Sequence, residues 1–351
     1  MKSPAEKILI VGPSWVGDMV MSQALYIYLQ QSRPGVSIDV LAPAWSEPLL
    51  QRMPEVNAAL TKPIGHGELA LGRRRRLGRQ LRGADYDQAI ILPNSIKAAL
   101  VPFLARIPLR TGWRGELRYG LLNDMRRLDP QALPLMVQRF VALGQDAGAP
   151  LPTVMPKPAL AIDPDAARAC GNDFGFERSR RLLALCPGAE FGPAKRWPAA
   201  YYATLAEHYL QQGWQVALFG SQRDADVSSE IRRATGDHPH CLDLAGRTTL
   251  AQAIDLLALA DAVVSNDSGL MHIAAALDRP TLVIYGPTTP DFTPPLTNRA
   301  DVLVSDLDCA PCFQRECPLQ HHRCMLDTTA DEVAAKLADL IAAHNPGEAT
   351  G

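Results

Sequence analysis

The sequence lacks any long hydrophobic run. No apolar stretch approaches the ~18 residues that span a bilayer, and the apolar segment at residues 8–11 is too short for the hydrophobic region of a secretory signal. The seven cysteines, an odd number, do not suggest a disulfide framework of the secreted kind. No internal repeat is evident. These absences predict a cytoplasmic globular protein.

The common dinucleotide-binding fingerprint is also missing. No G-x-G-x-x-G follows any predicted strand, which argues against a Rossmann oxidoreductase. The first loop, residues 12–18 (GPSWVGD), spaces its glycines as a phosphate-binding P-loop does, but Asp18 stands where that loop has lysine. Because a carboxylate there would repel phosphate, this loop is not built for a nucleotide.

What the chain does have is an ordinary globular composition with an uneven charge distribution. Hydrophobic residues make up 47% and charged residues 21%, and 351 residues suggest two domains. The 29 scattered prolines argue against a coiled coil. Residues 1–150 hold 19 basic and 12 acidic residues, whereas residues 151–351 hold 16 and 25. A basic first half suits an anionic partner, and a solvated basic face is the alternative interpretation.

Short β-branched runs alternate with amphipathic helical segments, which favours α/β domains with parallel sheets. Strands are expected at residues 8–11, 37–41, 89–92, 182–186, 215–219, 262–265 and 281–285, and helices at 19–31, 69–82, 96–105, 199–212, 224–234, 250–260 and 270–277. Proline-rich residues 149–158 predict a linker. We therefore expect Rossmann-like domains at 1–155 and 156–327 facing a central cleft. A helix within 328–351 is expected to pack back on the first domain.

Asp18 is the first candidate for chemistry. It follows the first strand, at the edge where α/β proteins bind ligands. There its carboxylate could accept a proton from an attacking hydroxyl. The alternative is a helix N-cap.

Loops after the second-domain strands predict an anion site. In residues 265–272 (SNDSGLMH), Ser268 and Gly269 would offer amides at a helix N-terminus, Asp267 could accept from sugar hydroxyls, and His272 lies one turn on. Lys195, in the loop 187–197, suits a phosphate. A further loop at 219–224 ends the next strand. Simple capping by Asp267 or Ser268 is the alternative.

The late cysteines form a possible metal set. Cys309, Cys312, Cys317 and Cys324 lie within sixteen positions, with His321 between them. Four thiols can hold zinc tetrahedrally, but these spacings are not those of a common zinc finger. A structural zinc, an iron–sulfur site and reduced thiols stay open, and no divalent metal is assigned to the reaction.

Several strings together resemble a known family. Residues 12–18, 92–95 (LPNS), 110–116 (RTGWRGE), 187–197 (PGAEFGPAKRW), 266–272 (NDSGLMH) and 285–287 (YGP) are similar to the bacterial ADP-heptose:lipopolysaccharide heptosyltransferases of glycosyltransferase family 9. The likeness covers residues 7–295, and its first-domain strings resemble the heptosyltransferase II group, which adds the second heptose of the inner core.

The resemblance implies a GT-B fold, with the acceptor on the first domain and ADP-heptose on the second. It implies an inverting, metal-independent transfer that requires no cofactor. Asp18 matches the family's general base and Lys195 its phosphate-contacting lysine, while relatives carry Thr where Ser268 stands. The predicted catalytic residues are Asp18 and Lys195, and the predicted donor-binding residues are Gly188, Glu190, Lys195, Ser221, Asp267, Ser268, Gly269 and His272.

The implied acceptor, heptosyl-Kdo2-lipid A, carries carboxylates and phosphates that suit the basic first half. The predicted acceptor contacts are Ser14, Trp15, Asn94, Lys97, Arg110, Trp113, Arg114 and Arg118, with Trp113 as a stacking surface. We expect peripheral contact with the cytoplasmic face of the inner membrane and no nucleic-acid partner. The alternatives are heptosyltransferase I or a later core heptosyltransferase and, in another class, a non-catalytic sugar-nucleotide-binding protein.

Overall fold

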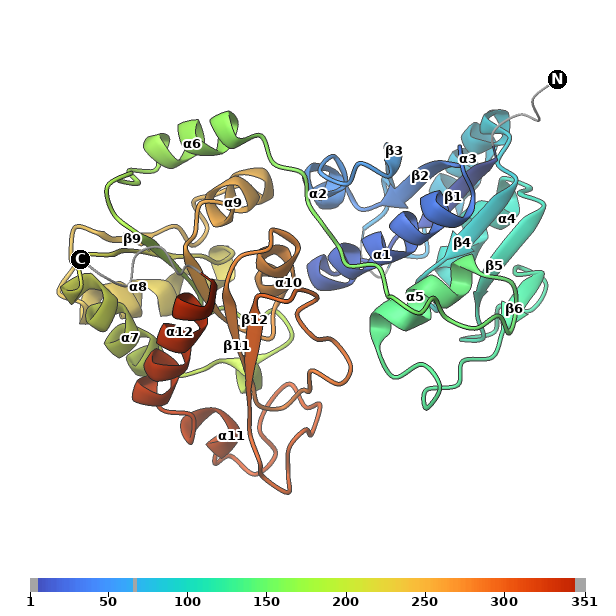
Figure 1. Ribbon diagram of the computed structural model, residues 1–351. Coiled ribbons are helices and arrows are strands. Elements are labelled where there is room, and N and C mark those ends of the chain that lie inside the picture. The colour runs from blue at the N-terminus through green and yellow to red at the C-terminus, as the bar shows by residue number, and fades with distance from the viewer. Residues whose placement is uncertain (1–5, 66–67, 345–351) are drawn as a thin grey trace. The chain divides into compact units, whose positions relative to one another are not determined.

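The computed structural model describes residues 6–65 and 68–344. The chain divides into two compact α/β units, residues 1–160 and 161–351 (Figure 1). The boundary therefore lies five residues beyond the one predicted at residue 155, after the proline-rich segment. Within the described ranges, no helix combines the length and apolar character needed to cross a membrane.

The first unit is built on a parallel six-stranded sheet in the order β3-β2-β1-β4-β5-β6. Its strands are β1 (Lys7–Val11), β2 (Ser37–Ala42), β3 (Val56–Thr61), β4 (Gln88–Ile91), β5 (Leu109–Trp113) and β6 (Asp124–Arg126). In the central register, Ile10 pairs with Val40 on one side and Ile90 on the other. Both β1 and β4 are almost wholly apolar and buried, as strands covered on both faces require.

Helices cover both faces of this sheet. The helices of the unit are α1 (Val16–Ser32), α2 (Glu47–Leu50), α3 (Leu71–Leu81), α4 (Ile96–Leu104) and α5 (Met136–Gly144). Helices α1 and α5 pack together, and a Cβ on Gly144 would lie 2.5 Å from a terminal methyl of Leu25, so a larger residue there would displace that side chain. Helices α3 and α4 share a core with Leu9 and Ile91.

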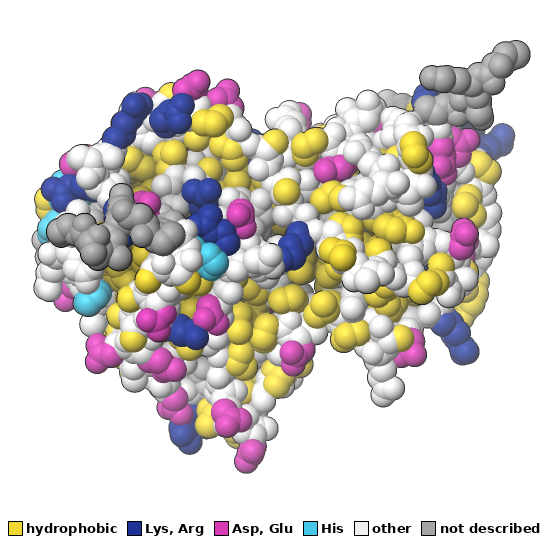
Figure 2. Space-filling view, viewed as in Figure 1, with side chains coloured by type: hydrophobic (Ala, Val, Ile, Leu, Met, Phe, Trp, Pro, Cys, Tyr) yellow, Lys and Arg dark blue, Asp and Glu magenta, His cyan; other side chains and the backbone are white. Residues whose placement is uncertain are grey.

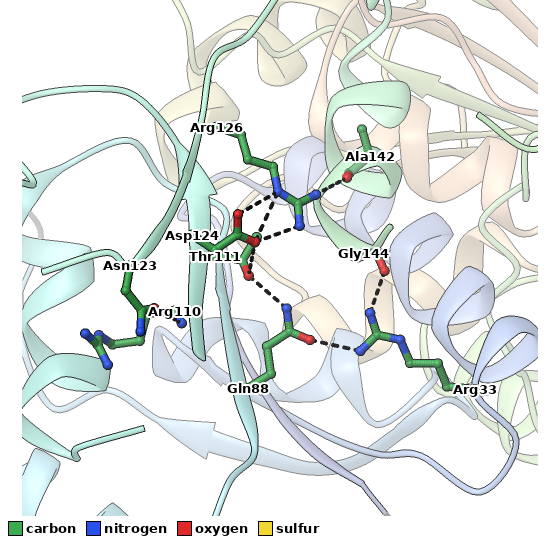
Figure 3. A network of polar contacts seen from close by, with 9 residues as sticks. All are labelled: Arg33, Gln88, Arg110, Thr111, Asn123, Asp124, Arg126, Ala142 and Gly144. Atoms are coloured by element: carbon green, nitrogen blue, oxygen red, sulfur yellow. Dashed lines mark hydrogen bonds and ion pairs between the residues drawn. The ribbon is translucent and has the colours of Figure 1, made fainter. Parts of the chain in front are cut away.

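A buried polar network ties the amino ends of β4, β5 and β6 to two helices (Figure 3). Gln88 donates to Thr111 Oγ1 at 2.8 Å, and that hydroxyl donates to Asp124 at 2.9 Å. Arg126 pairs with Asp124 at 2.7 Å and donates to the Ala142 carbonyl of α5. Arg33, the C-cap residue that follows α1, donates to both Gln88 and the Gly144 carbonyl. The network thus satisfies buried polar groups far from the loops at the carboxyl ends of the strands.

The second unit repeats this design. Its sheet is also parallel, in the order β12-β11-β10-β7-β8-β9. Counted from each unit's first strand, both sheets follow the order 3-2-1-4-5-6 of the Rossmann fold. The strands are β7 (Leu182–Cys186), β8 (Gln215–Leu218), β9 (Cys241–Asp243), β10 (Ala262–Asn266), β11 (Thr281–Tyr285) and β12 (Ala300–Val304).

The helices of the second unit are α6 (Pro164–Asp173), α7 (Ala199–Gln211), α8 (Ala225–Ala234), α9 (Leu250–Leu257), α10 (Gly269–Ala276), α11 (Arg323–Leu326) and α12 (Ala330–His344). Helices α7, α8 and α12 contribute to one core against Leu183, Val264 and Ile284. Helices α6 and α9 pack on each other, and Met271 of α10 packs against Val283 and Tyr285. On the face shown in Figure 2, acidic and basic side chains of this unit are interspersed.

The prediction that the C-terminal helix packs back on the first domain is wrong. Val333, Leu337 and Ile341 of α12 are buried in the core of the second unit, against α7 and the central strands. The i, i+4, i+8 spacing of these three residues forms one apolar stripe, and this stripe packs against α7, β10 and β11 of the second unit. Residues 345–351 of the predicted segment lie outside the described residues.

The other differences concern short or half-exposed elements. The strands β3, β5, β6, β9 and β12 and the helices α5 and α6 were not expected from the sequence. Edge strands such as β3 and β12 are only half-buried and carry polar residues, so they lack the continuous apolar run that marks a central strand.

Candidate active site

The loops that follow the central strands of the second unit meet at one edge of its sheet. Residues 187–197 follow β7, residues 219–224 follow β8, and the loops after β10 and β11 begin at Asp267 and Gly286. Because these neighbouring strands are parallel, their carboxyl ends share one edge, where α/β folds bind ligands.

Lys195 and Asp267 meet at this edge as a buried ion pair. Lys195 Nζ lies 2.5 Å from Asp267 Oδ2, and the same oxygen accepts a hydrogen bond from Thr288 Oγ1 at 2.7 Å. The side chains are only 12% and 7% exposed, and the ammonium also lies over the Phe191 ring. Asp267 therefore holds Lys195 in place while the ammonium keeps further N–H donors for an anion. Thr288 was not foreseen from the sequence.

The N-terminus of α10 lies next to this pair in the chain. Ser268 is the N-cap residue, and its hydroxyl accepts a hydrogen bond from Met271 N at 3.4 Å. Ser268 and Gly269 remain partly exposed, so the start of the helix is accessible. The capping expected as the alternative is thus present for Ser268, and it leaves the first amides of the helix free to face an anion.

His272 lies inside the unit rather than on its surface. The side chain is 5% exposed, and burial lowers the pKa of His272 to about 4, although Asp267 opposes the shift. The imidazole is therefore neutral at physiological pH. A neutral His272 near the pair can offer one donor or one acceptor, but no positive charge.

Gly188 is required by the close approach of a buried carboxylate. A Cβ on Gly188 would lie 2.5 Å from the Asp224 carboxyl carbon. Asp224 accepts from Ser221 N at 2.9 Å and from Ser221 Oγ at 2.7 Å, and it faces Arg196 at 3.4 Å. The Ser221 hydroxyl thus caps a turn, and Asp224 links the loops after β7 and β8.

Two further contacts hold the 187–197 loop. Glu190 forms an exposed ion pair with Arg223 of the neighbouring loop. Asn266, the last residue of β10, is fully buried; its side chain accepts from Trp197 N at 3.1 Å and donates to the Pro187 carbonyl at 2.7 Å. Sequence reasoning used Asn266 only as part of a motif, although a polar residue ending an apolar strand signals such a role.

In the first unit, Asp18 lies in the first turn of α1 and is half-buried. The N-cap residue of α1 is Trp15, not Asp18, so the capping alternative for Asp18 does not hold. Trp15 is 45% exposed beside it, and Ser14 is half-buried. A carboxylate in the first turn is favoured by the helix dipole, and the loop after β1 places it at the carboxyl edge of the sheet.

Three predicted acceptor contacts are wrong. The guanidinium of Arg118 is wholly buried and donates to the Pro93 and Trp113 carbonyls and to Asn94 Oδ1. Trp113 is 7% exposed, and its indole N–H donates to the Arg139 carbonyl, so no ring face is open for a sugar.

Arg110 is the second residue of β5 and therefore lies near the opposite, amino edge of the sheet, where Figure 3 shows it beside Asn123. Its guanidinium donates to the Leu121 and Ile107 carbonyls. A basic residue that satisfies carbonyls of its own chain contributes loop structure rather than ligand charge.

The remaining predicted contacts lie at the carboxyl edge. Asn94 is exposed in the loop after β4 and is oriented by Arg118. Lys97 is half-buried in the first turn of α4, and Arg114 is exposed just after β5. With Ser14, Trp15 and Asp18 they form a polar rim at the ends of adjacent strands β1, β4 and β5.

The cysteine segment braces the loops of the second unit. Ala194 N donates to the Arg315 carbonyl at 3.1 Å, the Arg315 guanidinium lies over Phe191, and Phe313 N donates to the Pro287 carbonyl at 2.7 Å. Cys309, Cys312, Cys317 and Cys324 are free thiols, and Cys309 Sγ lies 3.8 Å from His321 Nε2. Across the described ranges, no three acidic, His or Cys side chains form a ready metal site. A structural zinc there stays a prediction.

Comparison with known proteins shows to which family a chain with this fold and this site belongs. The model of glycosyltransferase family 9 (heptosyltransferase) matches residues 74–323. This chain belongs to glycosyltransferase family 9. It is 50% identical over 342 residues to lipopolysaccharide heptosyltransferase 2 of Salmonella typhimurium, covering 95% of this chain and 98% of that protein. The corresponding protein of Haemophilus influenzae, a lipooligosaccharide heptosyltransferase 2, is 47% identical over 345 residues, which cover 95% and 99%.

The structure of Escherichia coli ADP-heptose lipopolysaccharide heptosyltransferase II is 48% identical and superposes with a TM-score of 0.87, covering 96% of this chain and 99% of that one. A lipopolysaccharide heptosyltransferase 1, from Pseudomonas aeruginosa, is 29% identical over 331 residues, which cover 90% of this chain and 88% of that protein. The two Rossmann-like units of this family 9 member are those of the GT-B fold, and the family's members are glycosyltransferases.

Proposed function

We propose that this chain transfers a heptose from ADP-heptose to the first heptose of the lipopolysaccharide inner core. The observation that carries the proposal is the identity of about one residue in two, over nearly the whole chain, with heptosyltransferases named for this second addition. The heptosyltransferase 1 relative is far less similar, which favours the second addition over the first.

In the proposed reaction, the acceptor hydroxyl oxygen forms a bond to the anomeric carbon of the donor. The bond from that carbon to the β-phosphate oxygen breaks, and ADP leaves with the electron pair. The hydroxyl proton passes to Asp18, whose position in the first turn of α1 supports the role of general base. Attack opposite the leaving group inverts the anomeric carbon.

The developing charge on the diphosphate needs donors fixed in advance. Lys195, held by Asp267 and Thr288, supports this role, as do the accessible amides of Ser268 and Gly269 at the start of α10. The reaction we propose uses this ammonium and these amides in place of a divalent metal. His272, kept neutral by burial, adds shape and one hydrogen-bonding group to the donor site.

We propose that the acceptor lies on the first unit, against Asn94, Lys97 and Arg114 with Ser14 and Trp15. Because the acceptor is anchored in lipid, the enzyme works in peripheral contact with the cytoplasmic face of the inner membrane. Basic residues at the rim suit the carboxylates and phosphates of the inner core.

Mass spectrometry of the product tests the proposal. The purified protein is incubated with ADP-heptose and either of two matched acceptors, one bearing a single heptose and one bearing none. We expect the mass of one heptose residue to be added only to the heptosylated acceptor. Addition only to the acceptor without heptose indicates the first transfer, and no addition to either indicates a binding protein.

A further inference from the structure

Helix α3 separates its residues into a packed side and an exposed side. Leu77 and Gly78 pack toward α4, where a Cβ on Gly78 would lie 2.6 Å from Leu104 Cβ. Arg74 is buried on the same side and donates to the carbonyls of Leu69 and Lys97 at 2.7 and 2.8 Å. The close packing fixes which way the rest of the helix faces.

The exposed side of α3 carries three arginines whose side chains face solvent. Arg75, Arg76 and Arg79 line a shallow groove of about 400 Å³ together with Gly72 and Gln80. No hydrogen bond or ion pair joins their guanidinium groups to any residue within 6–65 and 68–344. Three like charges within two turns of one helix repel each other, and an external anion bound there would relieve that repulsion.

The neighbouring arginines make the contrast clear. Arg73 pairs with Glu68, and Arg82 donates to the Leu104 carbonyl, so the fold satisfies them as it satisfies Arg74. The fold therefore engages the basic residues on either side of the exposed stripe and leaves the stripe itself available.

Exposed leucines continue the stripe at the start of α3. Leu71 is 56% exposed and stands four residues before Arg75, on the same side of the helix, and Leu69 is 49% exposed. The N-terminus of α3 lies toward the carboxyl edge of the sheet, because α3 leads into β4 from that edge. Leu69, Leu71, Arg75, Arg76 and Arg79 together are called the α3 surface below.

We propose that the α3 surface docks on the anionic headgroups of a phospholipid bilayer. Arginines would contact lipid phosphates while Leu69 and Leu71 enter the boundary of the acyl chains, the pattern of interfacial helices. Exposed leucines favour a bilayer over a nucleic acid or a sugar phosphate, which offers them no apolar phase. The proposal rests on the proposed function, since a lipid-anchored acceptor requires the enzyme to reach the membrane.

Vesicle sedimentation tests the surface. The variant Arg75→Gln/Arg76→Gln/Arg79→Gln is compared with wild type on vesicles of phosphatidylethanolamine and phosphatidylglycerol in equal amounts, and on phosphatidylcholine alone. The matched control, Arg178→Gln/Arg233→Gln/Arg247→Gln, removes three exposed arginines from the second unit. We expect the α3 variant to bind the anionic vesicles about 100-fold more weakly, and the control to bind as wild type does.

A second variant, Leu69→Gln/Leu71→Gln, tests the apolar part. Salt screens the arginines but not the leucines, so we expect this variant to lose the binding that persists at high salt. Equal binding by the α3 variant and its control, or no binding by wild type to anionic vesicles, overturns the proposal.

Activity on an acceptor stripped of its acyl chains separates this proposal from the proposed function. We expect the α3 variant and its control to use this acceptor as wild type does. Loss of turnover in the α3 variant alone would place the arginines in the acceptor site and overturn the docking role. Failure of wild type itself on this acceptor would contradict the proposed function and leave the vesicle result to decide the docking surface.

Discussion

The two units share one strand order but use their basic residues differently at the same edge of the sheet. In the first unit, Arg118 is turned inward and donates to loop carbonyls. In the second, the side chain of Lys195 is 12% exposed and its ammonium pairs with Asp267 rather than with loop carbonyls. A shared fold therefore fixes where a ligand binds, while the partners of each charge decide whether it serves the loop or the ligand.

The largest expected effect comes from the carboxylate of the first unit. Asp18→Asn keeps the shape of the side chain but cannot accept the acceptor proton, so we expect the transfer rate to fall by about 10²–10⁴-fold. Initial rates measured under saturating donor and acceptor check this. A rate within tenfold of wild type would remove Asp18 from the reaction and reduce the first unit to a binding role.

The ion pair of the second unit is next. Lys195→Met leaves the buried Asp267 carboxylate without its partner, which costs about 3 kcal/mol of unfolding free energy. Asp267→Asn alone should also destabilise, whereas the double variant Lys195→Met/Asp267→Asn should recover much of the loss. Urea unfolding of the four proteins measures this coupling. Strictly additive losses would show that the two side chains do not act as a pair.

Within the first unit, Arg118 and Arg114 allow a buried arginine that holds a loop to be compared with an exposed arginine proposed to contact the acceptor. Arg118→Met leaves buried carbonyls unpaired and should lower the unfolding free energy by about 2–3 kcal/mol. Arg114→Met removes an exposed charge and should leave stability unchanged while raising KM for the acceptor. Thermal unfolding and acceptor titrations check the two variants side by side. A stable Arg118→Met protein with weakened acceptor binding would restore Arg118 to the acceptor site.

The buried His272 gives the smallest effect, a pH dependence. In the folded protein the pKa of His272 is about 4, below the ordinary value of 6.5. Below pH 6.5, therefore, His272 binds a proton in the unfolded chain but stays neutral in the folded one until the pH approaches 4. Stability from this group is thus lost as the pH falls from 6.5 toward 4, by about 2 kcal/mol between pH 7 and 5.

His272→Asn should reduce the loss of unfolding free energy between pH 7 and 5 by that amount. Urea unfolding of both proteins at the two pH values measures the difference. An identical pH dependence in wild type and variant would contradict a neutral, buried His272.

The sequence predicted much of this architecture, because the central strands and their helices carry strong apolar patterns. It placed Asp18, Lys195 and the start of α10 at the correct edges of their sheets. It could not tell that Arg118 and Trp113 face inward, because an arginine after a strand has the same local pattern whether water or carbonyls surround it. Thr288 and Arg315 escaped notice because their partners lie far away in the chain, and the same distance hid the contact of Asp224 with Arg196.

The most direct test of whether the second unit alone binds the donor is a titration of ADP-heptose into three proteins: wild type, Asp18→Asn and Lys195→Met. Calorimetry should give the same dissociation constant for Asp18→Asn as for wild type, and one about 10–100-fold weaker for Lys195→Met. Equal weakening by both substitutions, or unchanged binding in Lys195→Met, would contradict this assignment of the donor to the second unit.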